Sequence, residues 1–471
     1  MKRIAIIGGG IAGVAAAYEL ATLRNRSAEE VQVTLFEAST RLGGIIETVH
    51  EGGFVIEGGP DGWVTEKPWA RELAIELGLE DELTPSSDEQ RKTYVLVDGA
   101  LKAVPDGMRM MVPTDLAALE RTNLFSSKAL AGFHGELQRA DELKALAPDN
   151  DESVASFVER HFGEEVLVKI GAPLLSGVLG GDVSKLSVRA VMAPFVAMER
   201  EHGSLIKALQ ARTSATKKSS LFTTIRSGLG TLVDRMVAAV PQTWIRLNTA
   251  VTALERDESG WLVEHSFADG PSEQDHFDFV FLATPVHIAS ALLKPSNEMI
   301  AELMPSEASS AVIVGFAFDD AAKVAVPQGF GFLVPPGSES NTLLMACTFM
   351  DQKYPGRVPE GGRVLRAFFG GKAAERLMRC GNDEIAAVAR MELAHIIGPL
   401  PEPRLTIVRR LPQSLPQYAV GHLERMSELQ AIVGKLGDLA LLGNGYRGVG
   451  LPDLIRDARA AVQAQMTQTV Q

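Results

Sequence analysis

The chain of 471 residues is 46% hydrophobic and 22% charged, which is typical of a globular protein and excludes a disordered or fibrous one. Its formal net charge of −13 disfavours nucleic acid as a partner, because binding to phosphate backbones depends on clustered positive charge. The two cysteines, Cys347 and Cys380, are too few for a disulfide framework, and they favour a reducing, cytoplasmic location. The histidines and cysteines form no metal-binding motif, so we expect no metal site.

The chain starts with a segment that superficially resembles a secretory signal. Lys2 and Arg3 precede an uncharged run from Ile4 to Tyr18. This run contains three successive glycines at positions 8–10, which suit a tight turn better than a continuous signal helix. Elsewhere no apolar stretch reaches the length of about 18 residues that a membrane span requires. We therefore predict no transmembrane helix.

The first forty residues predict a βαβ unit that binds a dinucleotide. Strands are expected at 4–7 and 31–36, with a glycine-rich turn and a helix at 12–23 between them. Three glycines of the turn permit a tight bend, a close approach of the backbone to a pyrophosphate, and close packing of helix on strand: Gly8, Gly10 and Gly13, respectively. Glu37 ends the second strand, where a carboxylate accepts hydrogen bonds from a ribose diol. The same carboxylate repels a 2′-phosphate, which disfavours NADP.

Further glycine-rich passages favour FAD over NAD. The first contains Arg41, Gly43 and Gly44, which place a guanidinium near a pyrophosphate and let the backbone pass close to a flavin ring. A second passage includes Gly59-Pro60. Simple hairpin turns are the alternative explanation for these glycines. Together with the loop at 443–450 and a helix predicted after Pro452, they favour a flavin cradle with two ends, in which the last helix N-terminus stabilises reduced flavin.

The middle of the chain predicts an antiparallel sheet and a helical insert. Asp98-Gly99 favours a type I′ hairpin between strands at 94–97 and 101–104. Helical spacing then dominates 115–211, and a Ser/Thr/Lys-rich stretch at 213–220 is a candidate boundary. Further short strands are expected at 244–247, 261–264, 279–283, 311–318, 342–349, 364–369 and 439–442.

Motifs spread over the whole chain resemble those of one flavoprotein family. They lie at 172–182 with Leu186-Ser187, at 328–335, at Pro416-Gln417-Tyr418 with Gly421-His422, and at 443–450 with Asp453. With the N-terminal motifs they are similar to those of the FAD-dependent protoporphyrinogen and coproporphyrinogen oxidases of haem synthesis, within the flavin amine oxidase-like superfamily. The resemblance implies a mixed α/β (α+β) protein with a Rossmann-like domain, an antiparallel-sheet domain and a helical insert.

The resemblance implies three domains, two of them discontinuous. Their bounds are 1–90, 214–300 and 436–471 for the FAD-binding domain, 91–112 and 301–435 for the substrate-binding domain, and 113–213 for the helical domain. The cofactor would be non-covalent FAD, because no cysteine lies near the C-terminal loop. The implied cofactor-binding residues are Gly8, Gly10, Gly13, Glu37, Arg41, Gly43, Gly44, Gly59, Pro60, Val251, Gly443, Gly448, Val449 and Gly450.

The implied substrate is a porphyrinogen, a large apolar macrocycle with acidic side groups. By resemblance, the Gly177 carbonyl lies near it, Arg109 pairs with a propionate, and the macrocycle is held by Phe330, Gly331 and Leu333. The residues themselves also favour a flat apolar surface at Phe332 and Phe368, which lie close to glycines, although an ordinary sheet core is the alternative.

The implied activity is an oxygen-dependent porphyrinogen oxidase with three rounds of hydride transfer to FAD and release of peroxide. Likeness of 105–113 and 347–366 to soluble bacterial members favours coproporphyrinogen III over protoporphyrinogen IX. No residue is assigned as catalytic, because the cofactor carries hydride chemistry. A flavin amine oxidase, a carotenoid desaturase and a non-catalytic flavin-binding protein are the alternatives. The resemblance leaves a peripheral membrane contact and a homodimer open.

Overall fold

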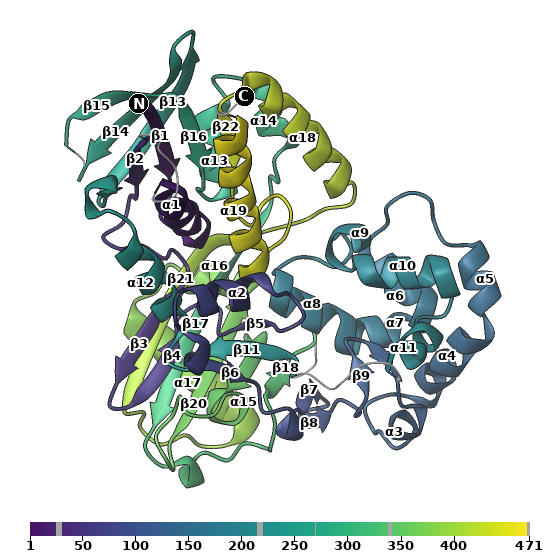
Figure 1. Cartoon of the computed structure of the whole chain (residues 1–471). Helices are drawn as coiled ribbons and strands as arrows, with labels where there is room; N and C mark the ends of the chain where they lie inside the picture. The colour runs from purple at the N-terminus through teal and green to yellow at the C-terminus, as the bar shows by residue number, and fades with distance from the viewer. Residues whose placement is uncertain (25–30, 214–219, 269, 338–341, 469–471) are drawn as a thin grey trace.

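The computed structural model describes residues 1–24, 31–213, 220–268, 270–337 and 342–468. Figure 1 shows three lobes: a parallel-sheet lobe at the upper left, a large-sheet lobe below it, and a helical lobe at the right. Both labelled chain ends lie in the parallel-sheet lobe (Figure 1). The combination of parallel and antiparallel sheets with helices confirms the predicted mixed α/β class.

The parallel-sheet lobe is built on five strands in the order β12-β2-β1-β16-β22. They come from distant parts of the chain: Ile245–Arg246, Val31–Phe36, Lys2–Ile7, Phe279–Leu282 and Leu439–Leu441. All neighbouring pairs are parallel, and their apolar runs suit strands that are buried on both faces. The helices that share the core of this sheet are α1 (Ile11–Arg24), α12 (Leu229–Ala239) and α19 (Leu451–Gln468). The predicted βαβ unit is confirmed to within two residues at each boundary.

A second core of this lobe lies on the opposite side of the parallel sheet. It is formed with the antiparallel strands β13 (Thr249–Asp257), β14 (Gly260–Phe267) and β15 (Ser272–Phe277), and with the helices α13 (Val286–Leu293), α14 (Glu298–Leu303) and α18 (His422–Leu436). Met426, Leu429 and Val433 of α18 are buried in this core. The sequence-based boundary at 435 therefore does not follow the packing, because α18 packs with the parallel-sheet lobe.

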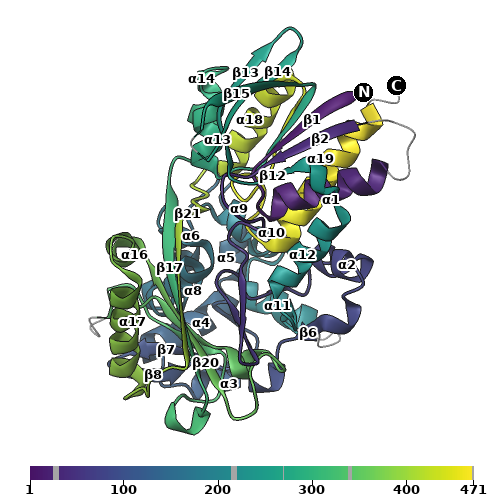
Figure 2. The same ribbon diagram turned by 90° about the vertical axis from the view of Figure 1, so that its left-hand side faces the viewer.

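The large-sheet lobe contains seven strands in the order β21-β17-β20-β19-β18-β7-β8. Their bounds are Leu405–Pro416, Ala308–Phe318, Arg363–Gly370, Ala346–Phe349, Gly331–Leu333, Thr93–Val97 and Ala100–Ala103. One face packs on α16 (Gly371–Leu377) and α17 (Asn382–Ile397), which lie together on one side of the sheet in Figure 2. The predicted hairpin is confirmed, with positive φ at Asp98 and Gly99.

Two sequence predictions about strands need correction. The strand expected at 342–349 is limited to β19, Ala346–Phe349. The strand expected at 244–247 is limited to Ile245–Arg246, because a single 3₁₀ turn at Gln242–Trp244 precedes it. The strand β21, which forms a long antiparallel pair with β17, was not predicted.

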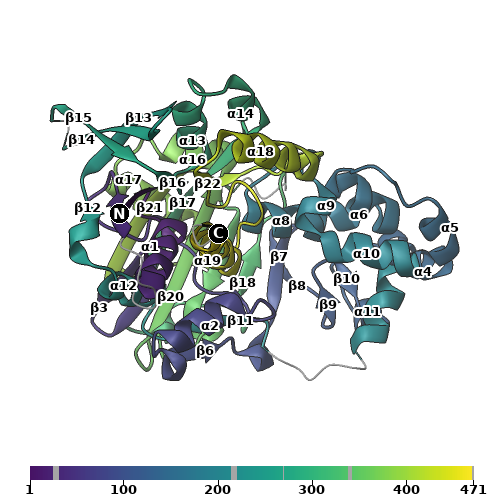
Figure 3. The same cartoon turned by 45° about the horizontal axis from the view of Figure 1, so that its top comes forward.

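The helical lobe confirms the predicted insert and has its own apolar core. Its helices are α3 (Leu116–Glu120), α4 (Ser127–Gln138), α5 (Ala140–Ala145), α6 (Val154–Phe162), α7 (Glu164–Val166), the π-helical turn Leu167–Gly171, α8 (Ala172–Leu179), α9 (Val188–Val191), α10 (Ala193–His202) and α11 (Leu205–Thr213). Most of them lie side by side at one end of the molecule in Figures 1 and 3. The candidate boundary at 213–220 falls mostly on residues 214–219, which are outside the described residues.

The remaining short elements lie within the lobes or between them. They are β3 (Thr48–Glu51), β4 (Phe54–Glu57), β5 (Trp63–Val64), α2 (Trp69–Glu76), β6 (Leu83–Pro85), β9 (Met108–Arg109), β10 (Val112–Pro113), β11 (Phe222–Ile225) and α15 (Met350–Lys353), with 3₁₀ turns at Glu80–Glu82, Asp88–Gln90 and Ala321–Lys323. Within the described ranges, no helix is both long and apolar enough to cross a membrane.

Candidate active site

The glycine-rich turn after β1 leaves open space at the N-terminus of α1. A Cβ atom on Gly8, where φ is +103°, would lie 2.7 Å from the Ala283 carbonyl oxygen, and one on Gly13 would lie 1.9 Å from the Gly8 carbonyl oxygen. Packing therefore requires both glycines. A Cβ on Gly10 would meet no atom within 4 Å. The turn thus leaves room at the N-terminus of α1, as binding of a pyrophosphate demands.

Glu37 joins the end of β2 to this turn. Its Oε2 accepts a hydrogen bond from the Gly9 N–H at 2.7 Å, and its Oε1 accepts one from the Ser39 N–H at 2.8 Å. The carboxylate therefore has a structural role as well as the predicted one. Each oxygen retains lone-pair capacity for a ribose hydroxyl, since a carboxylate has about four acceptor sites.

The loop that contains Arg41 packs directly on the glycine-rich turn. The Gly43 N–H donates to the Gly9 carbonyl at 2.8 Å, and a Cβ on Gly44 would lie 3.1 Å from the Gly10 Cα. Arg41 donates to the carbonyls of Ile46 at 2.9 Å and Gly44 at 2.6 Å. Its guanidinium thus fixes the shape of the loop, and contact with a pyrophosphate remains a prediction.

Gly59-Pro60 continues the same surface. A Cβ on Gly59 would lie 2.0 Å from the Ile45 carbonyl oxygen, so only glycine fits where the two loops meet. Pro60 is half-buried and leads into Asp61. The packing of one loop on another therefore requires glycine here. A simple hairpin turn, the alternative explanation for these glycines, would not require it.

The C-terminal loop forms the other end of the candidate cradle. Gly443 has φ of +126°, and Cβ atoms on Gly448 and Gly450 would lie 2.9 and 3.1 Å from the nearest atoms of Asp453. Val449 is half-buried between these glycines, just before α19 begins at Leu451. The Tyr418 hydroxyl, which donates to the Asn444 carbonyl at 2.6 Å, fixes the loop from outside.

One buried hydroxyl between the two glycine-rich loops has no partner. Thr284 Oγ1 is buried without a hydrogen bond, and the Thr284 backbone lies near the Cβ positions of both Gly8 and Gly443. A buried polar group without a partner is costly unless a ligand satisfies it. Two helix N-termini, bare glycines and this hydroxyl together fit an elongated dinucleotide such as FAD.

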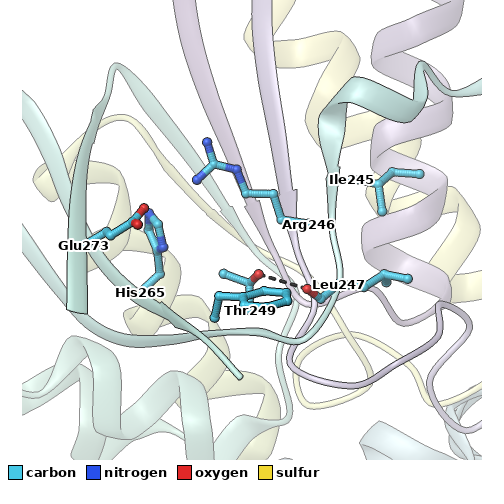
Figure 4. Close-up of a pocket in the computed structure, with 7 residues that line it drawn as sticks. Ile245, Arg246, Leu247, Thr249, His265 and Glu273 are labelled. Carbon is cyan, nitrogen blue, oxygen red and sulfur yellow. Dashed lines mark hydrogen bonds between the residues drawn. The ribbon is translucent and has the colours of Figure 1, made fainter. Parts of the chain in front are cut away.

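A pocket of about 350 Å³ lies beside β12 and the antiparallel strands β13, β14 and β15 (Figure 4). It is lined by Ile245, Arg246, Leu247, Thr249, His265, Phe267 and Glu273. It lies near Glu37, because the Glu37 N–H donates to the Arg246 carbonyl and the Thr249 N–H donates to the Glu37 carbonyl. Val251 pairs with His265 on the neighbouring strands. None of the predicted substrate residues lines this pocket.

The predicted substrate residues meet on one face of the large sheet. Strand register places Leu333, Ala346 and Phe368 side by side, with Gly331 and Thr348 in the next row. Gly177 of α8 reaches the same face, since its Cβ position lies 3.9 Å from Leu333 Cδ2. Phe330 is buried just before β18. We call Leu333, Ala346 and Phe368 the apolar strip.

The expectation that Phe332 contributes to the apolar substrate surface is wrong. It alternates with Leu333 and therefore points to the opposite face, into the core formed with α16 and α17. There its ring centroid lies 6.2 Å from that of Phe349. Phe332 therefore does not belong to the apolar strip.

Arg109 lies in the short β9–β10 hairpin and is 46% exposed. It forms an ion pair with Glu66, whereas its neighbours Met108 and Met111 are buried in the helical lobe. Its contact with a substrate carboxylate remains a prediction, and this contact would compete with Glu66.

Sequence reasoning missed a group of buried charged residues beside the apolar strip. Lys353 donates to both oxygens of Asp61 at 2.9 Å, and Arg366 Nη1 lies 3.2 Å from Asp61 Oδ2. Burial raises the pKa of Asp61, but Lys353 and Arg366 lower it more, so its pKa lies below its ordinary value. The only sequence signal was Asp61 itself, directly after Gly59-Pro60, because its partners lie far along the chain. Across the described part of the chain, no cluster of His, Cys, Asp and Glu is placed to hold a metal.

Comparisons with known sequences agree with this site. The family described as flavin containing amine oxidoreductase matches residues 11–464. Coproporphyrinogen III oxidase of Bacillus subtilis is 32% identical over 476 aligned positions, which cover 99% of this chain and 98% of that protein. Protoporphyrinogen oxidase 1 of Arabidopsis thaliana chloroplasts is 29% identical, with 96% and 86% covered.

Solved structures agree as well. A provisionally assigned protoporphyrinogen oxidase from Exiguobacterium sp. 255-15 has a TM-score of 0.85 and 29% identity, with 99% of both chains covered. Cyclohexylamine oxidase of Brevibacterium oxydans shares the fold, with a TM-score of 0.67, 19% identity and full coverage of both chains. FAD is therefore the cofactor, and the cradle described above fits it. The chain belongs to the flavin-containing amine oxidoreductase family and, within it, to the FAD-dependent porphyrinogen oxidases.

Proposed function

We propose that this protein oxidises coproporphyrinogen III to coproporphyrin III with molecular oxygen. The main support is the likeness over nearly the whole chain to the Bacillus subtilis enzyme of that name. The reaction removes six electrons and six protons from the macrocycle, and three oxygen molecules become three molecules of hydrogen peroxide. Bound FAD supplies the hydride acceptor in each of the three rounds.

The protein's own residues bind and orient the substrate. The apolar strip offers a flat surface for one face of the macrocycle. The helix α8 faces this strip at Gly177, where it carries no side chain. Gly331 has φ of +143°, and its Cβ position lies 2.0 Å from the Cys347 carbonyl oxygen, so a side chain cannot intrude here. Arg109 then holds a propionate at the edge of the site.

One assay distinguishes which of two related porphyrinogens the enzyme prefers. The purified, FAD-loaded protein is mixed with chemically reduced coproporphyrinogen III or protoporphyrinogen IX, and porphyrin fluorescence is followed. We expect a higher kcat/KM for coproporphyrinogen III. A higher value for protoporphyrinogen IX would assign the activity named for the Arabidopsis relative.

The same assay tests the more distant alternatives. An amine oxidase or a carotenoid desaturase would leave both porphyrinogens at the background rate of air oxidation, and so would a flavin-binding protein without an active site. Oxygen consumption with amines or carotenoids would then distinguish these alternatives. FAD that acid precipitation releases completely would agree with non-covalent binding.

Cytoplasmic location, a peripheral membrane contact of the helical lobe and a homodimer are further expectations that rest on sequence composition or family resemblance. Fractionation of cells tests the location, and co-flotation with anionic vesicles tests the membrane contact. Light scattering of the purified protein tests the homodimer.

A further inference from the structure

Lys353, Arg366 and Asp61 form a buried cluster with more positive than negative charge, which we call the Asp61 cluster. The side chains of Arg366, Lys353 and Asp61 are 1%, 11% and 15% exposed. Two cations share one carboxylate, so the cluster has a formal charge of +1. Uncompensated buried charge is costly, and proteins retain it mainly where a ligand or a reaction uses it.

The Asp61 cluster joins the FAD cradle to the apolar strip. Arg366 Nη2 donates to the carbonyl of Gly59, which packs on the loop that contacts the glycine-rich turn. On the large sheet, Arg366 pairs with Thr348 and is two residues from Phe368. Its guanidinium carbon lies 5.0 Å from the centre of the Phe368 ring. The cluster thus touches elements of both candidate binding surfaces.

Several hydrogen-bond donors around the Asp61 cluster have no acceptor. Arg366 Nε, Thr348 Oγ1 and the Tyr354 hydroxyl are buried without a partner. Lys353 packs 4.9 Å from the centre of the Phe222 ring and 5.1 Å from that of Tyr354, so aromatic faces rather than a second carboxylate surround its ammonium group. Unpaired donors and excess positive charge both favour an anion at this position.

The adjacent charged pair does not neutralise the cluster. Arg357 and Glu57 are both fully buried and pair with each other at 2.8 Å, so their charges cancel. Glu57 also accepts hydrogen bonds from the Leu229 N–H and the Thr48 hydroxyl. This neutral pair connects β4 to the loop after α15, and Arg357 Nη1 is a further buried donor without a partner.

We infer that Lys353 and Arg366, held in place by Asp61, stabilise the negative charge that bound FAD gains when it accepts a hydride. This inference rests on the proposed hydride chemistry, but it concerns the cofactor and not the identity of the substrate. Each hydride brings two electrons and one proton, which adds one negative charge to the ring system. A net positive cluster beside the cradle favours that charge because the surrounding protein screens it weakly.

Two substitutions change the cluster charge in opposite directions. Lys353→Met removes one cation and should lower the equilibrium constant for two-electron reduction of bound FAD about tenfold, or about 30 mV. Asp61→Asn removes the anion and should raise the constant by about the same factor. Lys353→Arg keeps the charge and should restore the wild-type value. The potential is measured by reductive titration against reference dyes, without any porphyrinogen.

Lys169→Met is the matched control, because Lys169 also pairs with a carboxylate, Glu165, but in the helical lobe. It should leave the potential unchanged. As a second measurement, sulfite, an anion that binds oxidised flavin and bleaches its colour, should bind about tenfold more weakly to Lys353→Met and more tightly to Asp61→Asn.

Shifts in the same direction for both charge variants, or shifts no larger than that of the control, would overturn the inference. If Asp61→Asn does not fold, the difference between Lys353→Met and Lys353→Arg decides alone. Opposite shifts combined with no porphyrinogen oxidation would leave this inference intact and refute the proposed function instead.

Discussion

Two groups of buried charge in this protein differ in how completely they are hydrogen-bonded. In the helical lobe, His161 lies between Glu136 and Glu199 at 3.2 and 3.0 Å, and Arg160 joins Glu199 to Glu152. We call these five residues the His161 network. Backbone and hydroxyl donors complete it, since Glu136 also accepts from the Leu205 N–H and the Ser204 hydroxyl, both at 2.6 Å. In the Asp61 cluster and beside it, by contrast, Arg366 Nε, Thr348 Oγ1 and the Tyr354 hydroxyl are buried without a partner.

Buried charge alone therefore does not indicate a ligand site. The His161 network connects α4, α6, α10 and the start of α11, and none of its side-chain atoms is buried without a partner. It therefore explains how the helical lobe is held together. In and beside the Asp61 cluster, by contrast, some buried donors have no acceptor, and the cluster lies beside the cradle, which is the pattern expected where a ligand completes the site.

The largest effect is expected from Glu199→Ala, which leaves Arg160 and His161 without their shared carboxylate. Breaking a buried ion pair costs about 3–5 kcal/mol, so the free energy of unfolding should fall by that amount. Denaturant titration measures it, with the exposed neighbour Glu201→Ala as a control that should change little. The FAD potential of the folded variant should not change. A shifted potential would break the distinction between the two groups.

Glu37→Ala tests whether complete hydrogen bonding always means a purely structural role. Glu37 already accepts two backbone hydrogen bonds, yet we expect it to bind ribose. Loss of the charged acceptor should weaken FAD binding ten- to a hundredfold, or about 1.5–3 kcal/mol. Titration of the apoprotein with FAD measures this, and the exposed Glu258→Ala is the control. An unchanged affinity for FAD would show that Glu37 only stabilises the turn and does not bind ribose.

Arg109→Ala should raise KM for coproporphyrinogen III about tenfold and leave kcat nearly unchanged, because a propionate is remote from the carbon that loses hydride. Glu66→Gln removes the competing carboxylate and should lower KM. These two variants test the exposed ion pair Arg109–Glu66 in the same way as the two groups of buried charge. If both leave KM unaltered, Arg109 has no part in binding.

The smallest expected effect is the pH dependence of the His161 network. Burial lowers the pKa of His161, but hydrogen bonds to Glu136 and Glu199 outweigh burial and raise it above 6.5. Its stabilising contribution is therefore complete below about pH 6.5 and is lost as the pH rises through the folded-state pKa. The pKa of Glu199 is lowered, because His161 and Arg160 outweigh its burial, so its contribution is lost in acid.

The network should accordingly stabilise the fold most between about pH 4.5 and 6.5. Thermal unfolding across this range measures the effect, and His161→Gln should flatten the alkaline side of the profile. A profile that His161→Gln leaves unaltered would contradict the assignment.

Local sequence patterns predicted the local parts of this fold. The βαβ unit and the Asp98-Gly99 hairpin depend on neighbouring residues, and both were found close to their expected positions. The strand β21 was missed because Pro412 and Pro416 disfavour a strand, yet β21 pairs at the sheet edge and the register shifts where Gln413 adopts positive φ. The Asp61 cluster could not be predicted, because only the fold brings Lys353 and Arg366 to Asp61.

The strand order of the parallel sheet determines how late in synthesis that sheet can be completed. The strand β16 lies between β1 and β22, so the sheet that supports the cradle is complete only after Leu439–Leu441 has been synthesised. The glycine-rich turn is synthesised long before the C-terminal loop, so it lacks its C-terminal partner for most of translation. Contacts between such distant segments make folding slow. Both ends of the cradle are therefore present only late in assembly, and we expect tight binding of FAD only at that stage.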